Sequence, residues 1–523
     1  MAKLLDVSAF VSVLLRGLTL IFESLLVGGT AFQILRIKHA RAQAGADELV
    51  RPFSLTMRTA ALGLAATQFL FVSINCLILT GTTGLKLGEV IGANFAIAGL
   101  ATVAGCILLI VYLGKATLSL VAQAGLVLVI LLSCVATSHA WSRMDHRGIS
   151  TSFTFLHHLA AGIWIGALPY LLISLHRATD PGRMSSIVRS FSSMAMGGVS
   201  AVLISGASLS FLYLKSPSDL YGTSYGAMVV SKMLLTAGTL ALGATNFFIV
   251  RRLGQNPESG FRRLRRLVEA EIGIGFTVML AAASLASQPP AIDLVEGRVT
   301  RADIVQRFTP EFPRLTTPAL AQLSPATDEL LPSTPGDIAW SEYNHHWAGL
   351  IVAGVGLLAF ASRGGKLKWA RHWPLLFMAL AVFLFLRADP ENWPLGPNGF
   401  WKSFLVAEVL QHRLFVLLII GFAIFEWRVQ NGRSHSTWMP YVFPGICALG
   451  GAVLLSHSHS LSNSKDSTLI ELSHIPMAIL AVYAGWSRWL ELRMEPESPK
   501  VLSRIWTVCF FAIGAALLLY REA

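Results

Sequence analysis

The sequence has few charged residues and little cysteine, and both shortages restrict the kind of protein that it encodes. Charged side chains make up only 13% of the 523 residues, whereas 54% of the residues are hydrophobic. An average soluble domain carries roughly 25% charged residues, and a water-soluble fold could not bury this much apolar surface. The five cysteines lie far apart without a C-x-x-C pair, so they predict neither a disulfide framework nor a zinc knuckle.

Two further absences exclude classes of function. No G-x-x-x-x-G-K-[ST] loop occurs, and no stretch that we expect in the cytoplasm is long enough for a nucleotide-binding domain. The formal charge of +12 comes from basic residues that lie between apolar runs and form no continuous stripe. Because such residues are typical of topology signals, we expect no nucleic-acid partner.

The sequence is rich in long apolar runs, and these predict the fold class. Runs of about twenty residues with few charges are long enough to cross a bilayer as helices. We therefore expect an all-α, polytopic transmembrane helical bundle with about fourteen spans. The segment from Ala9 to Gln33 has no small-residue cleavage site after it and is expected to remain as the first span. The predicted spans are 8–35, 53–80, 88–113, 116–138, 152–175, 189–214, 224–250, 264–287, 344–362, 373–387, 401–427, 438–457, 468–489 and 501–520.

The charges of the loops predict the topology and the division of the chain. Loops rich in Lys and Arg alternate with loops that are poor in them, and the positive-inside rule places the rich loops in the cytoplasm. Both termini are then outside. We predict an eight-span N-terminal half, a Pro-rich outer loop that acts as a cap or a partner surface, and a six-span C-terminal half. Their ranges are 1–287, 288–343 and 344–523.

The histidines are distributed unevenly in this topology. Four of the fourteen fall in cytoplasmic loops, and the other ten lie on the outer side or within spans. A single histidine of this kind is more typical of an interface residue than of a ligand. Ten on one side instead indicate a metal or haem site, because imidazole binds late first-row metals and haem iron. The ten are His139, His146, His157, His158, His345, His346, His412, His457, His459 and His474.

Local spacings single out some of these histidines. His457 and His459 are two residues apart, which points both imidazoles to one side where the chain is extended. His474 and Met477 share a helix face, and a soft thioether beside imidazole suits Cu(I), although a Met at this spacing is more often packing.

An intramembrane carboxylate accompanies another of the histidines. Glu408 and His412 are four residues apart, so Glu408 is predicted to orient His412 or to relay protons. A structural pairing of Glu408 with Arg413 is the alternative.

Several motifs resemble one family. The stretch LHHLAAGIWIG at 156–166, together with Ser205-Gly206, Tyr225-Gly226, Lys232 and Asn246, is similar to the CopD family of bacterial copper-resistance membrane proteins. His139 matches the outer-loop histidine of that family, and NHHWAG at 344–349 and QHR at 411–413 resemble its longer members. The first four spans are poorly matched, and Gly166-Ala167 replaces a frequent Gly-Gly pair.

The resemblance implies a multi-pass protein of the bacterial inner membrane that takes up or delivers copper from the periplasmic side. We expect no enzymatic activity. The expected partners are the lipid bilayer, the copper ion and a periplasmic copper-binding protein. The predicted copper ligands are His139, His157 and His158 in the first half, and His345, His346, His412, His457, His459, His474 and Met477 in the second.

Two alternatives remain open from the sequence. Histidines on facing spans, such as His412 with His474 or His346 with His457, could ligate b-type haem in a membrane redox protein. The other alternative is a scaffold without metal whose outer loop docks a periplasmic protein. A visible spectrum distinguishes haem from Cu(I), because only a bis-imidazole haem has a sharp reduced band.

Overall fold

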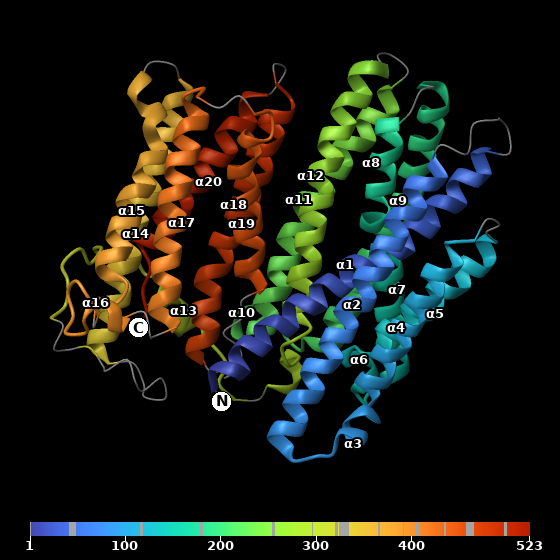
Figure 1. Cartoon of the computed structure of the whole chain (residues 1–523), viewed down its shortest axis with the longest axis horizontal. Helices are drawn as coiled ribbons and strands as arrows, with labels where there is room; N and C mark the ends of the chain where they lie inside the picture. Colours follow the sequence, from blue (N-terminus) through green and yellow to red (C-terminus); the bar gives the residue numbers. More distant parts are fainter. Residues whose placement is uncertain are drawn as a thin grey trace. The chain divides into compact units, whose positions relative to one another are not determined.

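The computed structural model consists of helices and connecting loops, and no strand occurs in the part of the chain that it describes (Figure 1). The described residues are 2–40, 49–115, 119–177, 181–253, 257–294, 296–319, 323, 334–364, 367–390, 392–403, 407–433, 436–456, 465–495 and 499–522. Within these ranges the description leaves out the side chains of 2–7, 9, 37–40, 139, 257, 402–403, 407–408 and 411.

The apolar runs form helices because a bilayer offers no water to satisfy the backbone, and a helix satisfies it internally. Among the described residues, twelve helical segments are long and apolar enough to cross a membrane. The predicted all-α polytopic bundle is thus confirmed as a class. Each of the fourteen predicted spans overlaps a helix, and the two outside the twelve are α5 (Leu120–Ala136) and α17 (Ala407–Gln430).

The chain forms two compact units, which we describe separately. Unit 1 comprises Met1–Arg298 with Leu455–Ser467, and unit 2 comprises Val299–Leu454 with Thr468–Ala523. The boundary at residue 298 falls within the predicted outer loop 288–343. The long helices of unit 1 are α1 (Ala2–Ala40), α2 (Val50–Thr83), α4 (Asn94–Tyr112), α5, α7 (Arg147–Ala161), α8 (Leu168–Arg177), α9 (Pro181–Tyr213), α11 (Ser224–Arg252) and α12 (Pro257–Leu285).

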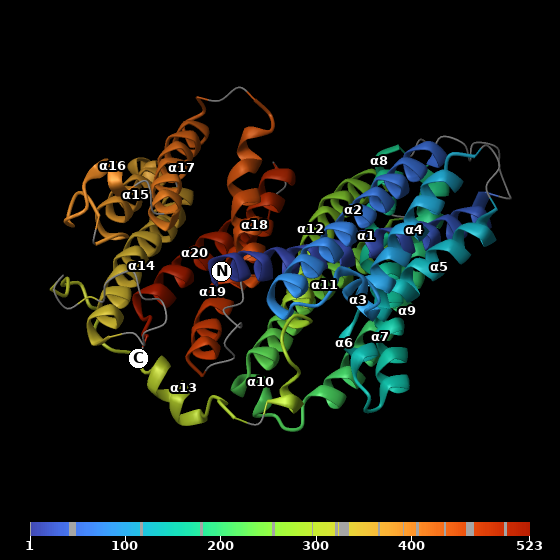
Figure 2. The ribbon, with the colours of Figure 1, turned by 60° about the horizontal axis from the view of Figure 1, so that its bottom comes forward.

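Short elements complete unit 1 between these helices. Figure 2 shows α6 and α10 at the same end of the unit, which is the predicted outer end. At that end the Thr223 hydroxyl caps α11 by accepting a hydrogen bond from the backbone N–H of Gly226. The short elements are α3 (Leu87–Ile91), α6 (His139–Ser142), η2 (Gly162–Gly166), α10 (Asp219–Gly222) and η3 (Ala291–Asp293).

The fifth predicted span contains a π-helical turn, η2, between α7 and α8. Glycines in α1 and η2 let the two backbones touch, since a Cβ on Gly166 would lie 1.9 Å from the Ser24 carbonyl oxygen. A Cβ on Gly28 would likewise lie 2.1 Å from the Gly166 carbonyl carbon. π-turns occur frequently at functional sites, and this one lies directly after the adjacent histidines of α7.

Unit 2 is built around a close pair of helices, α14 and α20. A Cβ on Gly514 would lie 2.2 Å from the Ala353 nitrogen, so this small residue allows the helices to approach. Beside them, the rings of Trp373, Phe443 and Trp506 pack with centroids 5.3–5.9 Å apart. The elements are α13 (Arg301–Phe308), α14 (Pro335–Arg363), η5 (Lys368–Leu375), α15 (Leu376–Arg387), α16 (Phe400–Ser403), α17, η6 (Met439–Tyr441), α18 (Val442–Ser456), α19 (Lys465–Arg493) and α20 (Lys500–Leu518).

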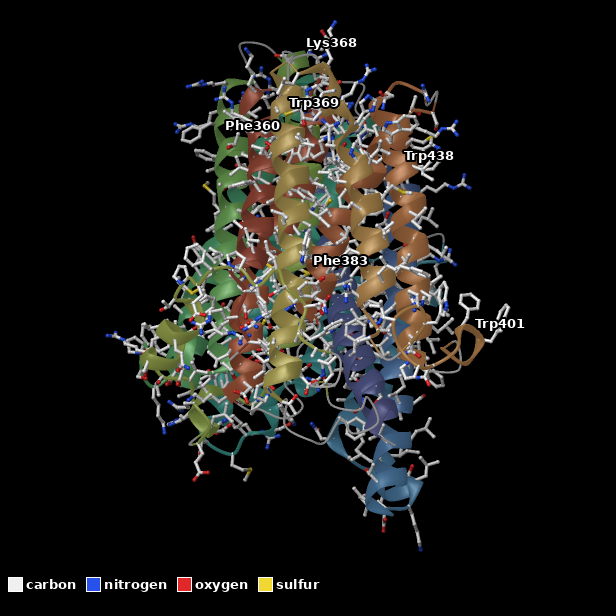
Figure 3. The ribbon with its side chains drawn as sticks, turned by 90° about the vertical axis from the view of Figure 1, so that its left-hand side faces the viewer. Phe360, Lys368, Trp369, Phe383, Trp401 and Trp438 are labelled. Atoms are coloured by element: carbon white, nitrogen blue, oxygen red, sulfur yellow. The ribbon has the colours of Figure 1, made fainter. Side chains whose placement is uncertain are left out.

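Exposed tryptophans mark both ends of the helices in unit 2. Trp369 and Trp438 lie near one end, beside Lys368, and Trp401 lies toward the other end (Figure 3). Tryptophan is enriched at the two interfaces of a bilayer, where its ring contacts lipid and its N–H contacts water. This arrangement is typical of a unit that spans a membrane. The cytoplasmic position of the Lys368 end stays a prediction.

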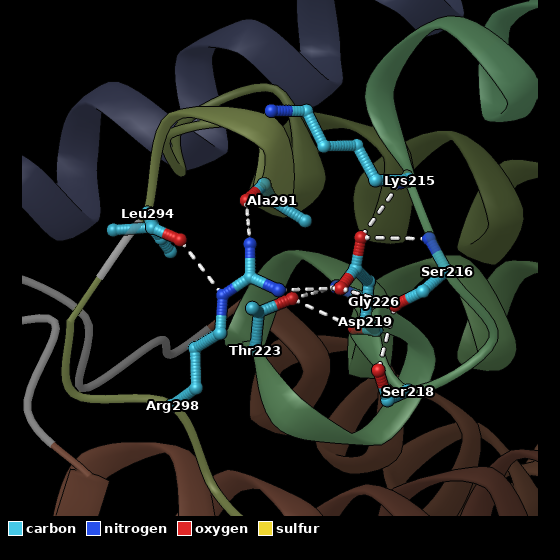
Figure 4. A network of polar contacts seen from close by, with 9 residues as sticks. All are labelled: Lys215, Ser216, Ser218, Asp219, Thr223, Gly226, Ala291, Leu294 and Arg298. Atoms are coloured by element: carbon cyan, nitrogen blue, oxygen red, sulfur yellow. Dashed lines mark hydrogen bonds and ion pairs between the residues drawn. The ribbon is translucent and has the colours of Figure 1, made fainter.

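A polar network joins the loops at the α10 end of unit 1 (Figure 4). The Arg298 guanidinium donates to Asp219 Oδ1 at 2.6 Å and to the carbonyl oxygens of Ala291 and Leu294 at 2.7 Å. Burial alone would raise the pKa of Asp219, but hydrogen bonds from the backbone of Lys215 and from Ser216, with the Arg298 charge, lower it below its ordinary value. The network thus holds the loop before α11 against the loop after α12.

Candidate functional site

A carboxylate and an imidazole meet inside unit 1. Glu23 of α1 is 3% exposed, and His158 Nδ1 of α7 lies 3.1 Å from Glu23 Oε1. Because a carboxylate accepts, Nδ1–H donates, and the lone pair of a neutral His158 ring then lies on Nε2. A carboxylate that orients a histidine in this way is the usual support of a metal ligand.

A thiol lies beside the same carboxylate. Cys134 of α5 is buried, interacts electrostatically with Glu23, and has Sγ 3.9 Å from Thr102 Oγ1 of α4. Glu23 Oε2 is also buried, and no described group hydrogen-bonds to it at normal distances. We refer to Glu23, His158, Cys134 and Thr102 as the Glu23 cluster. Imidazole and thiol are the donor types that suit copper.

The neighbouring His157 has its own partner. Its Nδ1 lies 3.0 Å from the Ser205 hydroxyl oxygen, and that hydroxyl donates to the Ala201 carbonyl oxygen at 2.6 Å. His157 Nδ1–H therefore donates to Ser205, which leaves the lone pair on Nε2. Gly206 makes room for the ring, since a Cβ there would lie 3.3 Å from His157 Cε1. Both adjacent histidines thus have the tautomer that offers Nε2.

The two histidines lie deeper than their predicted position at the outer end of the span. The helix begins at Arg147 and not at residue 152, so His157 is the eleventh residue of α7. At about 1.5 Å per residue, His157 is about 15 Å from the start of the helix. The Glu23 cluster therefore lies inside the bundle of unit 1, between α1, α4, α5 and α7.

The described side chains do not form a complete metal site. No three His, Cys, Asp or Glu side chains converge closely enough to hold an ion in the part of the chain that the structure describes. The side chain of His139 lies outside the described residues, although its backbone begins α6. The assignment of His139, His157 and His158 as ligands stays a prediction.

In unit 2 the predicted histidines have different environments. His345 stacks on Tyr520 with centroids 4.0 Å apart, and the His474 ring lies 6.1 Å from the His345 ring. His345 Nδ1–H donates to the Ser341 carbonyl oxygen and His474 Nδ1–H to the Ile470 carbonyl oxygen, each at 2.8 Å. These bonds place the lone pair of each neutral ring on Nε2, as a metal ligand requires.

His346 has a hydrogen-bond partner on each ring nitrogen. Its Nδ1 accepts a hydrogen bond from the Arg314 backbone N–H at 2.7 Å, and its Nε2–H donates to the Tyr520 carbonyl oxygen at 2.8 Å. Both ring nitrogens are therefore occupied in this arrangement. Burial raises the pKa of Tyr520 to about 12, so the phenol that accepts from Arg307 stays protonated at neutral pH.

His412 is paired with an acidic residue that the sequence analysis did not identify. Its Nδ1 lies 2.7 Å from Asp389 Oδ1, in the loop after α15, and the Arg413 guanidinium donates to the carbonyl oxygens of Phe385 and Trp393. His474 instead lies beside the rings of His345 and Tyr520. The haem pairs stay a prediction.

The remaining predicted residues of unit 2 give less information. Met477 is buried in α19. The side chain of Glu408, and His457 and His459 altogether, lie outside the described residues. Their predicted roles stay predictions.

Comparison with known proteins identifies part of unit 1. The family described as CopD, Copper resistance protein D, matches residues 185–285, which run from α9 to the end of α12. We refer to residues 185–285 as the CopD segment. The predicted resemblance to that family is thereby confirmed, and Ser205, Lys232 and Asn246 fall inside the CopD segment. His157 and His158 precede it, although Ser205 of the CopD segment binds His157.

One relative has a described activity. The copper transport protein CutJ of Bacillus subtilis (strain 168) is 31% identical to this chain over 163 residues, which cover 31% of the chain. The aligned part is 29% of the length of CutJ, so the chain spans less than a third of that relative. No solved structure matches the chain.

Proposed function

We propose that this chain is a copper transporter of the bacterial inner membrane, without enzymatic activity, that takes copper from the periplasmic side. The observation that carries the proposal is the pairing of the buried Glu23 with His158 beside the Cys134 thiol, with His157 held by the CopD segment. The CopD match and the similarity to CutJ support copper as the cargo.

The chemistry of the Glu23 cluster supports this role. An uncompensated carboxylate within a span costs roughly 2.5–3.5 kcal/mol on insertion scales, so such residues are usually retained for ion pathways. Soft sulfur with imidazole favours copper over Mg²⁺ or Ca²⁺, which prefer oxygen ligands. His158 would bind the ion through Nε2, Glu23 would orient His158 and offset positive charge, and Cys134 would contribute sulfur. A periplasmic copper-binding protein would supply copper to the outer end.

The test measures copper binding by the purified full chain. His158→Ala and Glu23→Gln should each weaken copper binding at least about tenfold, because each removes a ligand or its orienting group. His176→Ala is the matched control, since His176 is exposed at the other end of the same span and donates to the Leu172 carbonyl oxygen of its own helix. Copper bound equally by all four proteins would overturn the proposal. A sharp reduced haem band in the visible spectrum would also contradict it.

A further inference from the structure

A second buried carboxylate, Glu271, lies within the CopD segment. It belongs to α12, is 3% exposed, and lies at a cavity of about 420 Å³ between η2, α8, α9, α11 and α12. Most of the lining is apolar, including Leu171, Phe191 and Val199. The polar side chains beside Glu271 are Trp164 and Asn246. The cavity thus leads to one acidic group within the membrane-spanning part of unit 1.

Neutral donors hold this carboxylate. Trp164 Nε1–H donates to Glu271 Oε1 at 3.0 Å, and the Asn246 amide donates to Oε2 at 2.7 Å. Among the described residues, no Lys, Arg or His forms an ion pair with Glu271. A carboxylate in a low-dielectric site without a counter-charge has a strong tendency to bind a cation.

Asn246 can serve Glu271 in both protonation states. Its Oδ1 is buried and has no described hydrogen-bond partner, while its amide nitrogen donates to the carboxylate. Once Glu271 is protonated, its O–H needs an acceptor, and rotation of the Asn246 amide presents Oδ1. The same side chain therefore has a donor for the charged form and an unused acceptor for the neutral form.

The cavity continues toward the basic end of the unit. A second cavity of about 470 Å³ shares Ser192, Met196, Phe247 and Val250 with the first and is also lined by Arg189 of α9 and Arg251 of α11. These arginines repel metal cations, whereas a proton can pass along water molecules. The group that binds at Glu271 from this side is therefore a proton and not copper.

Other charged groups on the packed helices are directed elsewhere. Arg16 of α1 donates to the Ala286 carbonyl oxygen beyond the far end of α12, and Lys232 of α11 interacts with His157. Arg266 and Glu269 of α12 pair with each other at 3.0 Å. The residues of η2 and α8 that line the cavity do not titrate in the physiological range: Trp164, Leu168 and Leu171.

The π-turn connects this site to the Glu23 cluster. Trp164, which donates to Glu271, and Gly166, which packs on the Ser24 backbone, belong to the same five-residue turn η2. Ser24 is adjacent to Glu23. A change in the hydrogen bond of Trp164 therefore acts on the turn that contacts Ser24, the neighbour of Glu23. Glu23 is the residue that we propose to orient His158.

We propose that Glu271 is a proton-exchange site open to the basic end of unit 1, and that its proton moves in exchange for copper. The coupling rests on the proposed copper transport, whereas the protonation of Glu271 does not. One proton enters the Glu271 carboxyl from water in the cavity at the basic end and leaves toward the opposite side as one Cu⁺ ion crosses to the basic end, so the exchange transfers no net charge.

Infrared spectroscopy of the full chain in lipid tests the protonation directly. The difference between acidic and alkaline spectra should contain a carboxylic-acid carbonyl band that Glu271→Gln removes and Glu269→Gln retains. Glu269 is the matched control because it lies on the same helix but is paired with Arg266. Asn246→Leu should keep the band and shift it, since it removes the hydrogen-bond partner. A difference spectrum unchanged in both Glu271→Gln and Asn246→Leu would overturn the proposal.

Proteoliposomes with a pH-sensitive dye inside test the coupling. A pulse of Cu(I) should change the internal pH with the wild-type chain, and Glu271→Gln should reduce this change to that of empty liposomes. Copper transport by the wild type without any pH change would overturn the coupling and leave the copper function intact. No copper transport by the wild type would instead remove the proposed function, and the infrared result would still decide the role of Glu271.

Discussion

Glu491 of unit 2 differs from Glu23 and Glu271 of unit 1 in the partners of its buried carboxylate. In unit 2, Glu491 is 5% exposed and is bound by Arg363 at 2.8 Å, by Arg488 at 2.6 Å and by the Trp506 N–H at 2.8 Å. In unit 1, Glu23 has one histidine as its described ion-pair partner, and Glu271 has only neutral donors. The charge of Glu491 is therefore neutralised by the fold, whereas those of Glu23 and Glu271 remain available to a cation.

This difference separates structural from functional acidic residues. The guanidinium groups of Arg363 and Arg488 also lie over the Trp506 ring, 5.4 and 5.5 Å from its centroid. Glu491, the two arginines and the aromatic core therefore form one assembly. Such an assembly has no open coordination position. A carboxylate that retains an unsatisfied oxygen, as Glu23 does, can take an incoming ligand.

The largest expected effect comes from neutralising the structural acid. Glu491→Gln should destabilise the protein by about 3–5 kcal/mol, because two buried arginines lose their counter-charge. Glu271→Gln should change stability by only about 1 kcal/mol, because an uncompensated buried charge is removed. Thermal unfolding of the detergent-solubilised variants measures both. Equal destabilisation by the two substitutions would contradict the distinction between the units.

A smaller effect is expected at the contact of α1 with η2. Gly166→Val should destabilise unit 1 by about 1–3 kcal/mol, since its side chain would collide with the Ser24 backbone. It should also weaken copper binding, because Ser24 is adjacent to Glu23. Gly197→Val is the control, since a Cβ at Gly197 meets nothing within 4 Å. Unfolding temperatures and copper content that match the control would show that the close contact is unimportant.

The smallest effect is expected at the loops of the α10 end of unit 1, and it depends on pH. The pKa of Asp219 is lower in the folded protein than in the unfolded chain, so its stabilisation is present above about pH 4 and is lost as the pH falls through the folded pKa. Asp219→Asn should cost about 1–2 kcal/mol at neutral pH and less in acid. Unfolding temperatures measured between neutral and acidic pH check this. A constant difference between the two proteins across that range would contradict it.

The fold was largely predictable because bilayer-length apolar runs leave the backbone little choice but a helix. The helical boundaries were less accurate. The helix of the fifth predicted span begins at Arg147, since the polar residues Ser150, Thr151 and Ser152 satisfy their hydroxyl groups on backbone carbonyl oxygens. The π-turn was not foreseen, because it depends on the close approach of α1 at Gly28.

The candidate site was only partly predictable. The adjacent histidines of α7 were identified, but their partners come from distant parts of the chain: Glu23 is 135 residues away from His158, and Ser205 is 48 residues away from His157. Cys134 was not predicted as a ligand because the five cysteines lie far apart in the sequence, although it lies next to Glu23 in space. The available signal was the presence of acidic residues within spans, and Glu23 and Glu271 are among these residues.

The π-turn has a consequence for the register of the fifth span. Each residue of an α-helix rotates the next side chain by about 100° around the axis. A deletion of one residue from Gly162–Gly166 that restored a regular helix would therefore turn α7 relative to α8 by about that angle. His157 and His158 could then no longer face Ser205 and Glu23 while Tyr170 kept its hydrogen bond to the Leu25 carbonyl oxygen. The length of this turn sets which histidine meets which partner.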